Sequence, residues 1–249
     1  MRNVWIIARR EYKRFFTSPI AYIVAFFFMI ILGYFFYSDL YSAIQYSVYY
    51  QSPPPGAEIV TGQIVILLIF GIPAITMRSI SEEMRMGTME LLLTSPVRDW
   101  ELIVGKWLGA FLFMLSLLAF TLFLPLILNF LVKPGIDWGI LLSGYIGLIL
   151  MVACLLAIGV FISSLFSNQV VVFFISLFLF LILYIVLRPL GGSTSSGLGN
   201  QILTNVNFIQ HYMNLYQGTV DLKDIVYYLS ITSLALVFGT VSIEVRRWH

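Results

Sequence analysis

The sequence is short of charged residues and of cysteine. Only 10% of its 249 residues are charged, while 60% are hydrophobic; a soluble domain has about 25% charged residues. A protein this apolar cannot cover its surface with polar groups, so the composition predicts a protein whose solvent is a lipid bilayer. The single cysteine, Cys154, excludes a disulfide framework within the chain and a cysteine-based metal site.

The usual motifs for nucleotide binding and catalysis are missing as well. The one Gly-Lys pair, Gly105-Lys106, has Trp100 where a phosphate-binding loop needs its first glycine, so we expect no ATP binding by this chain. No zinc-protease helix or serine-nucleophile turn is present, and the run 138–187 contains no charged residue. Ion-coupled transporters usually keep ionisable residues at membrane depth. The sequence therefore disfavours an intramembrane enzyme and a secondary transporter, and predicts no metal or other cofactor held by the chain itself.

Long apolar runs predict an all-α polytopic membrane protein in which residues 1–249 form a single transmembrane domain. A membrane helix needs about 20 mostly apolar residues, so the fifty-residue run 138–187 must turn, and its polar cluster from Ser163 to Gln169 is where we expect the division. The six expected spans are, approximately, 20–37, 59–77, 107–132, 138–162, 170–187 and 225–243.

Basic residues are distributed unevenly over the expected loops. Eleven of the fourteen lie before the first span, between the second and third spans, or after the sixth. Positively charged loops stay in the cytoplasm. The distribution predicts a multi-pass protein with both termini in the cytoplasm, and the membrane that we expect is the bacterial inner membrane.

Two expected helices do not cross the membrane. Residues 1–17 form a basic amphipathic helix, with Val4, Trp5, Ala8, Tyr12, Phe15 and Phe16 on one face and Arg2, Arg9, Arg10, Lys13 and Arg14 on the other. Such a helix lies at the lipid headgroups, either as an anchor for anionic lipid or also in contact with a cytoplasmic partner. After a Gly- and Ser-rich run, Ile209, Met213 and Tyr216 mark one face of an outer helix, re-entrant or interfacial, that carries His211, expected to be a packing or surface residue.

The loop 78–106 is the most informative polar segment. Its composition is helical up to Met86, Gly87-Thr88 can turn the chain, and Ser95-Pro96 ends a second short helix. We expect this arrangement to expose Glu82, Glu83, Glu90 and the apolar ridge Leu91, Leu92 and Leu93 to the cytoplasm. Such a ridge is usually buried against something, which is either the protein's own helix ends or a groove on a partner.

The same loop carries a resemblance to a known family. Glu83, the run Gly87-Thr88-Met-Glu90-Leu-Leu-Leu-Thr-Ser-Pro96-Val, and Gly105-Lys106 resemble the cytoplasmic loop of ABC-2 type permeases. The subgroup associated with gliding motility and multi-copper-enzyme maturation is especially similar, and the tail Glu244-Val-Arg246-Arg247-Trp248 resembles its end. The six-span plan and the basic N-terminal helix also match.

The resemblance implies a permease subunit without catalytic activity. Two such subunits, as a homodimer or a heterodimer with a related permease, would assemble in membrane lipid with two copies of a separate ABC ATPase, which binds ATP and Mg²⁺. The loop 78–106 would be the coupling element, using Glu82, Glu83, Gly87, Thr88, Glu90, Leu91, Leu92, Leu93 and Pro96. The turn from Ser163 to Gln169 would be a smaller contact. Most members export their substrate; the alternative is a scaffold that transmits ATPase motion to an envelope or motility partner. No nucleic-acid partner is expected.

The topology leads to a labelling prediction. Single cysteines placed at Gln51 and Ser195 should react with an impermeant thiol reagent on intact cells, and a cysteine at Arg85 should react only after the membrane is opened. The opposite pattern of labelling would refute the orientation.

Overall fold

The structure is a computed structural model that describes residues 2–50, 56, 58–89, 97–133, 135–185 and 207–247. Its regular secondary structure in these ranges is helical, which confirms the all-α class. The helices are α1 (Arg2–Thr17), α2 (Pro19–Tyr50), α3 (Glu58–Thr76), α4 (Ser81–Arg85), α6 (Asp99–Thr121), α7 (Phe123–Leu131), α8 (Trp138–Leu165), α9 (Gln169–Ile185), α11 (Phe208–Tyr216) and α12 (Leu222–Arg247).

Five helical segments in the described ranges are long and apolar enough to cross a membrane. They are Ala21–Tyr46, Glu58–Arg85, Asp99–Leu131, Trp138–Leu165 and Leu222–Arg246. The apolar helix α9 has 17 residues, or roughly 26 Å at 1.5 Å per residue, which is slightly less than the ~30 Å of hydrocarbon. A sixth span at α9 therefore stays a prediction.

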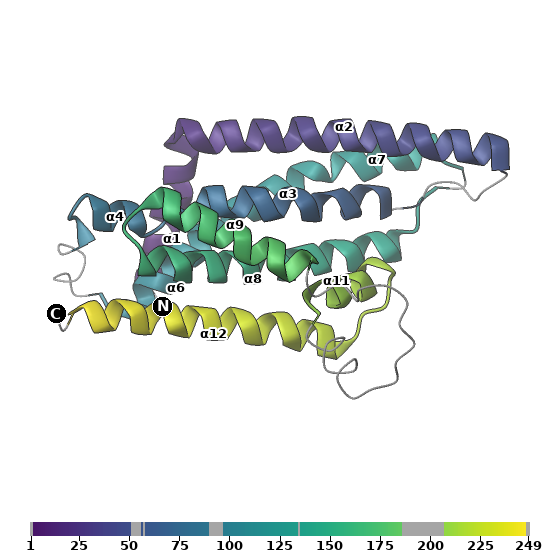
Figure 1. Ribbon diagram of the computed structural model, residues 1–249. Helices are drawn as coiled ribbons and strands as arrows, with labels where there is room; N and C mark the ends of the chain where they lie inside the picture. Colours follow the sequence, from purple (N-terminus) through teal and green to yellow (C-terminus); the bar gives the residue numbers. More distant parts are fainter. Residues whose placement is uncertain are drawn as a thin grey trace.

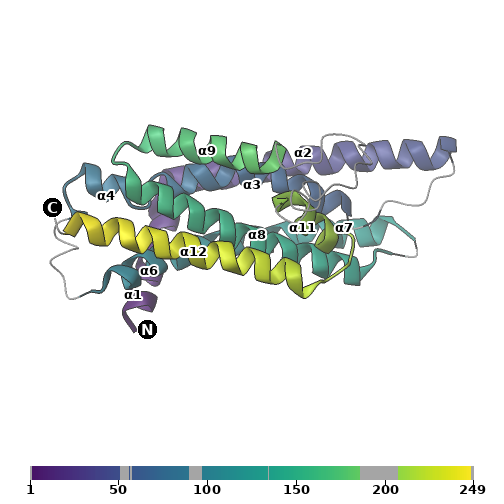
Figure 2. The same cartoon turned by 60° about the horizontal axis from the view of Figure 1, so that its bottom comes forward.

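The long helices lie along roughly one axis, beside a central helix (Figures 1 and 2). The central helix is α8, which contacts α3, α6, α9, α11 and α12. The N-terminus, α4 and the C-terminal end of α12 lie at one end of the bundle, while α11 lies toward the other (Figure 1). We call the first of these the basic end, because it carries the basic residues of α1 and α4 together with Arg246.

The helix α2 is longer than the sequence analysis expected. The first span was expected to end near Tyr37, but α2 continues to Tyr50 and reaches beyond the neighbouring end of α3 (Figure 1). Residues 38–50 contain no glycine or proline, so nothing in this stretch breaks the helix before Pro53. The side chain of Asp39 accepts a 2.8 Å hydrogen bond from Gln63 of α3, which fixes the middle of α2 to the bundle.

A proline divides the third apolar run into two helices. Pro125 has no N–H to donate, and its ring clashes with the carbonyl four residues earlier, at Thr121. That residue is the last of α6. The Thr121 hydroxyl lies 2.8 Å from the hydroxyl of Tyr145 on α8, so the break is held against the central helix.

The expected outer helix is α11, and it packs into the end of the bundle opposite the basic end. The Tyr212 hydroxyl donates to the carbonyl of Thr61 at 2.9 Å, and burial raises the pKa of this phenol. His211 is a packing residue with a polar partner: its ring stacks on Tyr227, and its Nδ1 lies 2.6 Å from Oδ1 of Asp224. Because Asp224 is fully buried, this pair ties α11 to the start of α12.

Close packing of α8 on α3 leads to a stability prediction. A Cβ added at Gly159 would lie 2.5 Å from Oγ1 and 2.9 Å from Cβ of Thr76, whereas a Cβ at Gly71 of α3 would meet nothing within 4 Å. Gly159→Ala should therefore push the two helices apart and cost about 1–3 kcal/mol. The matched Gly71→Ala should leave stability unchanged or slightly raised. Thermal unfolding in detergent measures both; equal behaviour of the two variants would contradict the packing.

Candidate functional site

The N-terminal helix α1 packs along the first half of α6. Contacts recur every fourth residue on both helices: the Asn3 side chain donates to Glu101 at 3.1 Å, and a stacked ring pair joins Phe15 to Phe113. Ile7 meets Gly105 between these two contacts. Residues four apart lie on one face of a helix, so α1 uses a single stripe for the whole interface.

Glycine at two positions of α6 allows this approach. A Cβ at Gly105 would lie 2.8 Å from the side chain of Ile7, and one at Gly109 would lie 2.6 Å from Cβ of Glu11 and 2.9 Å from the carbonyl of Ala8. Any larger residue would displace α1. Small residues four apart let membrane helices come close, and here they bring the carboxylate of Glu11 beside α6.

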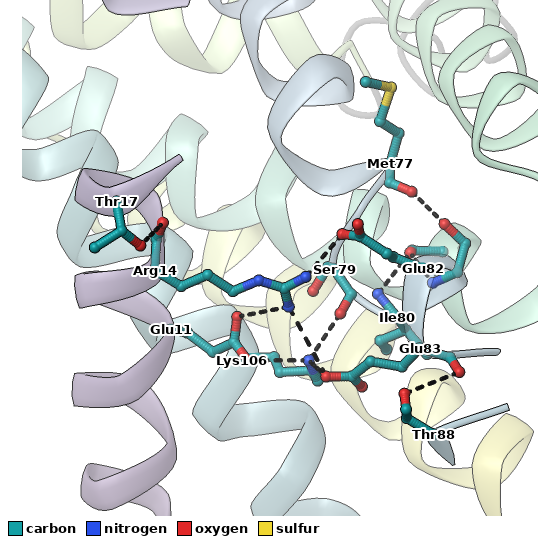
Figure 3. Close-up of polar contacts among 12 residues, drawn as sticks. Glu11, Arg14, Thr17, Met77, Ser79, Ile80, Glu82, Glu83, Thr88 and Lys106 are labelled. Carbon is teal, nitrogen blue, oxygen red and sulfur yellow. Dashed lines mark hydrogen bonds and ion pairs between the residues drawn. The ribbon is translucent and has the colours of Figure 1, made fainter. Parts of the chain in front are cut away.

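Lys106 lies at the centre of a buried ion cluster (Figure 3). Its ammonium has no exposed surface and donates to the carboxylate of Glu83 at 2.7 Å, to the carbonyl of Ser79 at 2.8 Å and to the carboxylate of Glu11 at 3.2 Å. An ammonium has three hydrogens to donate, so all three are used. The contacts join α6 to α1, to the turn between α3 and α4, and to α4.

An arginine on α1 completes the cluster. Arg14 binds Glu82 at 2.7 Å, and its guanidinium also lies 3.8 Å from Glu11 and 4.0 Å from Glu83. We call Glu11, Arg14, Glu82, Glu83 and Lys106 the Lys106 cluster. It holds three acids and two bases, and Arg10, 3.6 Å from Glu11, balances the remaining charge.

The burial of these charges decides what the cluster does. The side chains of Lys106, Glu11 and Glu83 are 0%, 7% and 8% exposed. A buried ion pair adds little net stability compared with apolar residues, but removing one partner costs about 3–5 kcal/mol because a charge is left unpaired. The cluster therefore fixes one arrangement of α1, α4 and α6 more than it strengthens the fold.

Two further contacts connect the basic end to α8. The backbone N–H groups of Ile80 and Ser81, where α4 begins, donate to the hydroxyl of Ser163 at 3.0 and 3.1 Å. The guanidinium of Arg246 donates to the carbonyl of Leu165 at 2.7 Å, at the end of α8. A cation at a helix C-terminus is favourable. The central helix is thus tied to α4 and to α12.

The structure brings together only part of the predicted coupling set. Glu82 is half-buried, and Gly87 turns the chain with φ +69°, the left-handed conformation that suits glycine. The Thr88 hydroxyl donates to the carbonyl of Glu83 at 3.3 Å. Glu90, Leu91, Leu92, Leu93 and Pro96 lie outside the described residues, so the roles predicted for them stay predictions.

One expectation of exposure is wrong. Glu83 was expected on the cytoplasmic surface, but its side chain is buried because it faces Lys106. The turn expected from Ser163 to Gln169 begins with two buried serines, Ser163 and Ser164, and continues with exposed residues at 165–168. Its expected contact with the ATPase stays a prediction.

The apolar face predicted for α1 coincides only in part with the face that packs on α6. The buried residues are Ile7, Ala8 and Glu11, of which Ala8 alone was expected on that face. Trp5 and Phe16 are exposed, as residues that meet lipid headgroups would be. The reason is that α1 covers a helix with one stripe and leaves its other apolar residues outside. Arg9, Arg10 and Lys13 are exposed, as a basic face requires, while Arg14 turns toward Glu82.

Sequence reasoning missed Glu11 and Lys106. Each carries a signal in hindsight: Glu11 is the one acid in a helix with five basic residues, and Lys106 precedes an uncharged run that continues to Val132. A charge inside an apolar helix or an acid inside a basic helix needs a partner of the opposite sign. The sequence does not say that the two are each other's partners across 95 positions.

The cluster leads to a prediction about stability. Lys106→Met should lower the free energy of unfolding by about 3–5 kcal/mol, because Glu11 and Glu83 would stay buried without their cation. Adding Glu11→Gln and Glu83→Gln should restore most of the loss. Lys133→Met, at an exposed position, is the control and should change little. Denaturation in detergent measures the series; a triple variant no better than Lys106→Met would argue against the ion cluster as the cause.

A comparison with known protein families covers nearly the whole chain. The model of a family described as ABC-2 family transporter protein matches residues 5–243. A search of curated proteins finds no match. The family match does not separate subgroups, so the resemblance to the gliding-motility and copper-enzyme-maturation permeases stays a prediction. The five membrane-length helices and the family match identify a multi-pass membrane component of a transporter that is not itself catalytic. Components of this family normally work with an ABC ATPase. The chain belongs to the ABC-2 transporter family.

Proposed function

We propose that the chain is the permease subunit of an ABC exporter. Two copies, or one copy and a related permease, span the bacterial inner membrane with their termini in the cytoplasm. Separate ATPase subunits bind ATP and Mg²⁺ and dock at the basic end, where the segment 78–106 passes their motion to the spans. The observation that carries the proposal is the Lys106 cluster, which ties this segment to α1 and α6.

The physical support is that the segment has a fixed base and an exposed tip. At its base, Glu83 and Ser79 bind Lys106, and Met89 is buried in a small apolar core with Ile80 and Ile103. At its tip, Arg85, Met86 and Gly87 are exposed, with Met86 57% accessible. A push on the tip is therefore passed to helices that are packed and cannot deform continuously.

This geometry divides the predicted coupling residues into two roles. Glu83 positions the segment from within, because it is buried on Lys106 and cannot reach a partner. Glu82 holds Arg14 of α1 and keeps part of its surface exposed. Direct contact with the ATPase falls to the exposed tip and to the predicted ridge Leu91 to Leu93. An exposed methionine suits such a surface, because its flexible, polarizable side chain adapts to a partner.

A second candidate function is a scaffold that passes ATPase motion to an envelope or motility partner. The observation in its favour is the far half of α2, which continues to Tyr50 and exposes Tyr37, Tyr41, Tyr46 and Tyr49. Tyrosine is enriched in protein interfaces. Substrate flux in vesicles that contain the permease and its ATPase separates the two: an exporter moves substrate without any envelope partner, and a scaffold does not.

Coupling is tested at the tip. Met86→Asp should lower the stimulation of the ATPase by the permease about tenfold, the effect of losing an interface residue worth about 1–2 kcal/mol. Because Met86 is exposed, the melting temperature of the isolated permease should not change.

The matched control is Val220→Asp, an exposed apolar residue between α11 and α12, toward the other end of the bundle. It should leave both ATPase stimulation and co-purification of the ATPase intact. If Met86→Asp behaves like Val220→Asp, this tip does not face the ATPase and the assigned coupling surface is wrong.

A further inference from the structure

A cavity of about 150 Å³ lies at the basic end, beside the Lys106 cluster. Its charged lining residues are Glu11, Arg14 and Glu82 of the cluster and Arg78, which follows α3. Apolar lining residues include Phe15, Ala21 and Ile75. About 10–15 Å³ of such space admits one water, so the cavity has room for a much larger polar group.

Arg78 is the cation of this cavity that is not satisfied within the described residues. Arg14 and Lys106 already serve the three carboxylates of the cluster. The Nε of Arg78 is buried and has no hydrogen-bond partner in the described part of the chain. A buried donor without an acceptor is costly, and more so when it is charged. The cavity therefore calls for an acceptor, and an anion is the one that suits a guanidinium.

An open apolar groove begins where the cavity ends. It has a volume of about 1040 Å³, runs between α2 and α6, and shares Phe15 and Ala21 with the cavity. Phe26, Phe27 and Phe120 line it and remain 56–64% exposed. The groove is formed by two membrane-spanning segments, so hydrocarbon chains are what its surface meets in a bilayer.

We propose that the cavity and the groove together form a binding site for one anionic phospholipid. The phosphate of the headgroup accepts from Arg78, with Arg14 beside it, and an acyl chain lies in the groove against Phe26, Phe27 and Phe120. Lipid binding at this site does not require transport activity. The exposed Arg10 lies 3.6 Å from Glu11 of the cavity lining, and basic residues near the membrane attract anionic lipid.

The observations favour a lipid over a peptide segment of a partner protein. The site has one polar pole and a long, apolar groove, which matches a headgroup with its chains. A peptide in the groove would bring backbone N–H and C=O groups into a surface with almost no polar atoms, and these would stay unpaired. The ion pairs also favour an anion: of the two arginines that line the cavity, Arg14 is paired with Glu82 and Glu11, whereas the buried Nε of Arg78 has no partner in the described residues.

The test measures lipid retained by the purified full chain, using native mass spectrometry after exchange into mixed micelles with phosphatidylglycerol and phosphatidylethanolamine. Arg78→Gln should lower phosphatidylglycerol retention about tenfold, the size of one lost charge-assisted hydrogen bond, and leave phosphatidylethanolamine unchanged. Arg85→Gln, at an exposed arginine outside the cavity, is the matched control and should retain both lipids. Ala74→Leu, on the cavity wall, should exclude the headgroup without any change of charge.

Each other outcome overturns the proposal. Normal retention by both Arg78→Gln and Ala74→Leu would mean that this cavity holds no lipid. Equal loss of both lipids in Arg78→Gln would mean that the site does not select an anion. Full displacement of phosphatidylglycerol by an equal concentration of glycerol 3-phosphate would identify a site for a soluble phosphate, since that molecule cannot use the groove. Equal losses of phosphatidylglycerol in Arg78→Gln and Arg85→Gln would mean that the whole basic surface, and not this cavity, attracts the lipid.

Discussion

The basic end is organised by the need to surround one buried ammonium. Lys106 lies seven residues after the start of α6 at Asp99, with no exposed surface. Its three hydrogens take acceptors from α1, from the turn between α3 and α4, and from α4. Because a charge in this position cannot be left unpaired without a large cost, the three elements have one mutual arrangement in which every donor is used. The glycines of α6 and the position of Ser163 under α4 are consistent with that single arrangement.

This arrangement supports the proposal that the segment after α3 is a connector between the ATPase and the spans. It is short, and its helix α4 has only five residues, which alone would not hold a direction in water. Its stability comes from outside: from the Ser163 hydroxyl at its start, from Lys106 at Glu83 and from the apolar core around Met89. In the proposed coupling, a connector built in this way would move with α6 and α8 as one body.

Composition and hydropathy were enough to predict the all-α membrane class, because lipid allows few ways to satisfy a backbone. They also located α8 and α12, whose apolar runs are long. Details that depend on tertiary partners were not predictable. The periodicity of α1 showed an apolar face, but Ile7 and Glu11 are buried because of glycines 98 positions later, and no local pattern contains that fact. Glu83 looked like a surface acid because its buried partner, Lys106, lies 23 positions later in the sequence. The end of α2 differs for another reason: hydropathy falls after Tyr37, but Tyr, Ser and Gln do not end a helix, and α2 continues to Tyr50.

The pairing of α1 with α6 has a consequence for biosynthesis. Glu11 and Lys106 are separated by 95 positions, and translation proceeds at about 5–20 residues per second, so roughly 5–20 s pass before the acid of α1 meets its cation. During that interval α2 and α3 are inserted while α1 has no helix to cover. The exposed Trp5, Ile6 and Phe16 and the basic side chains between them allow α1 to bind the membrane interface during this interval. The exposed side chains of α1 do not contribute to its interface with α6. Their consequence is for assembly: they keep α1 at the membrane until α6 is inserted.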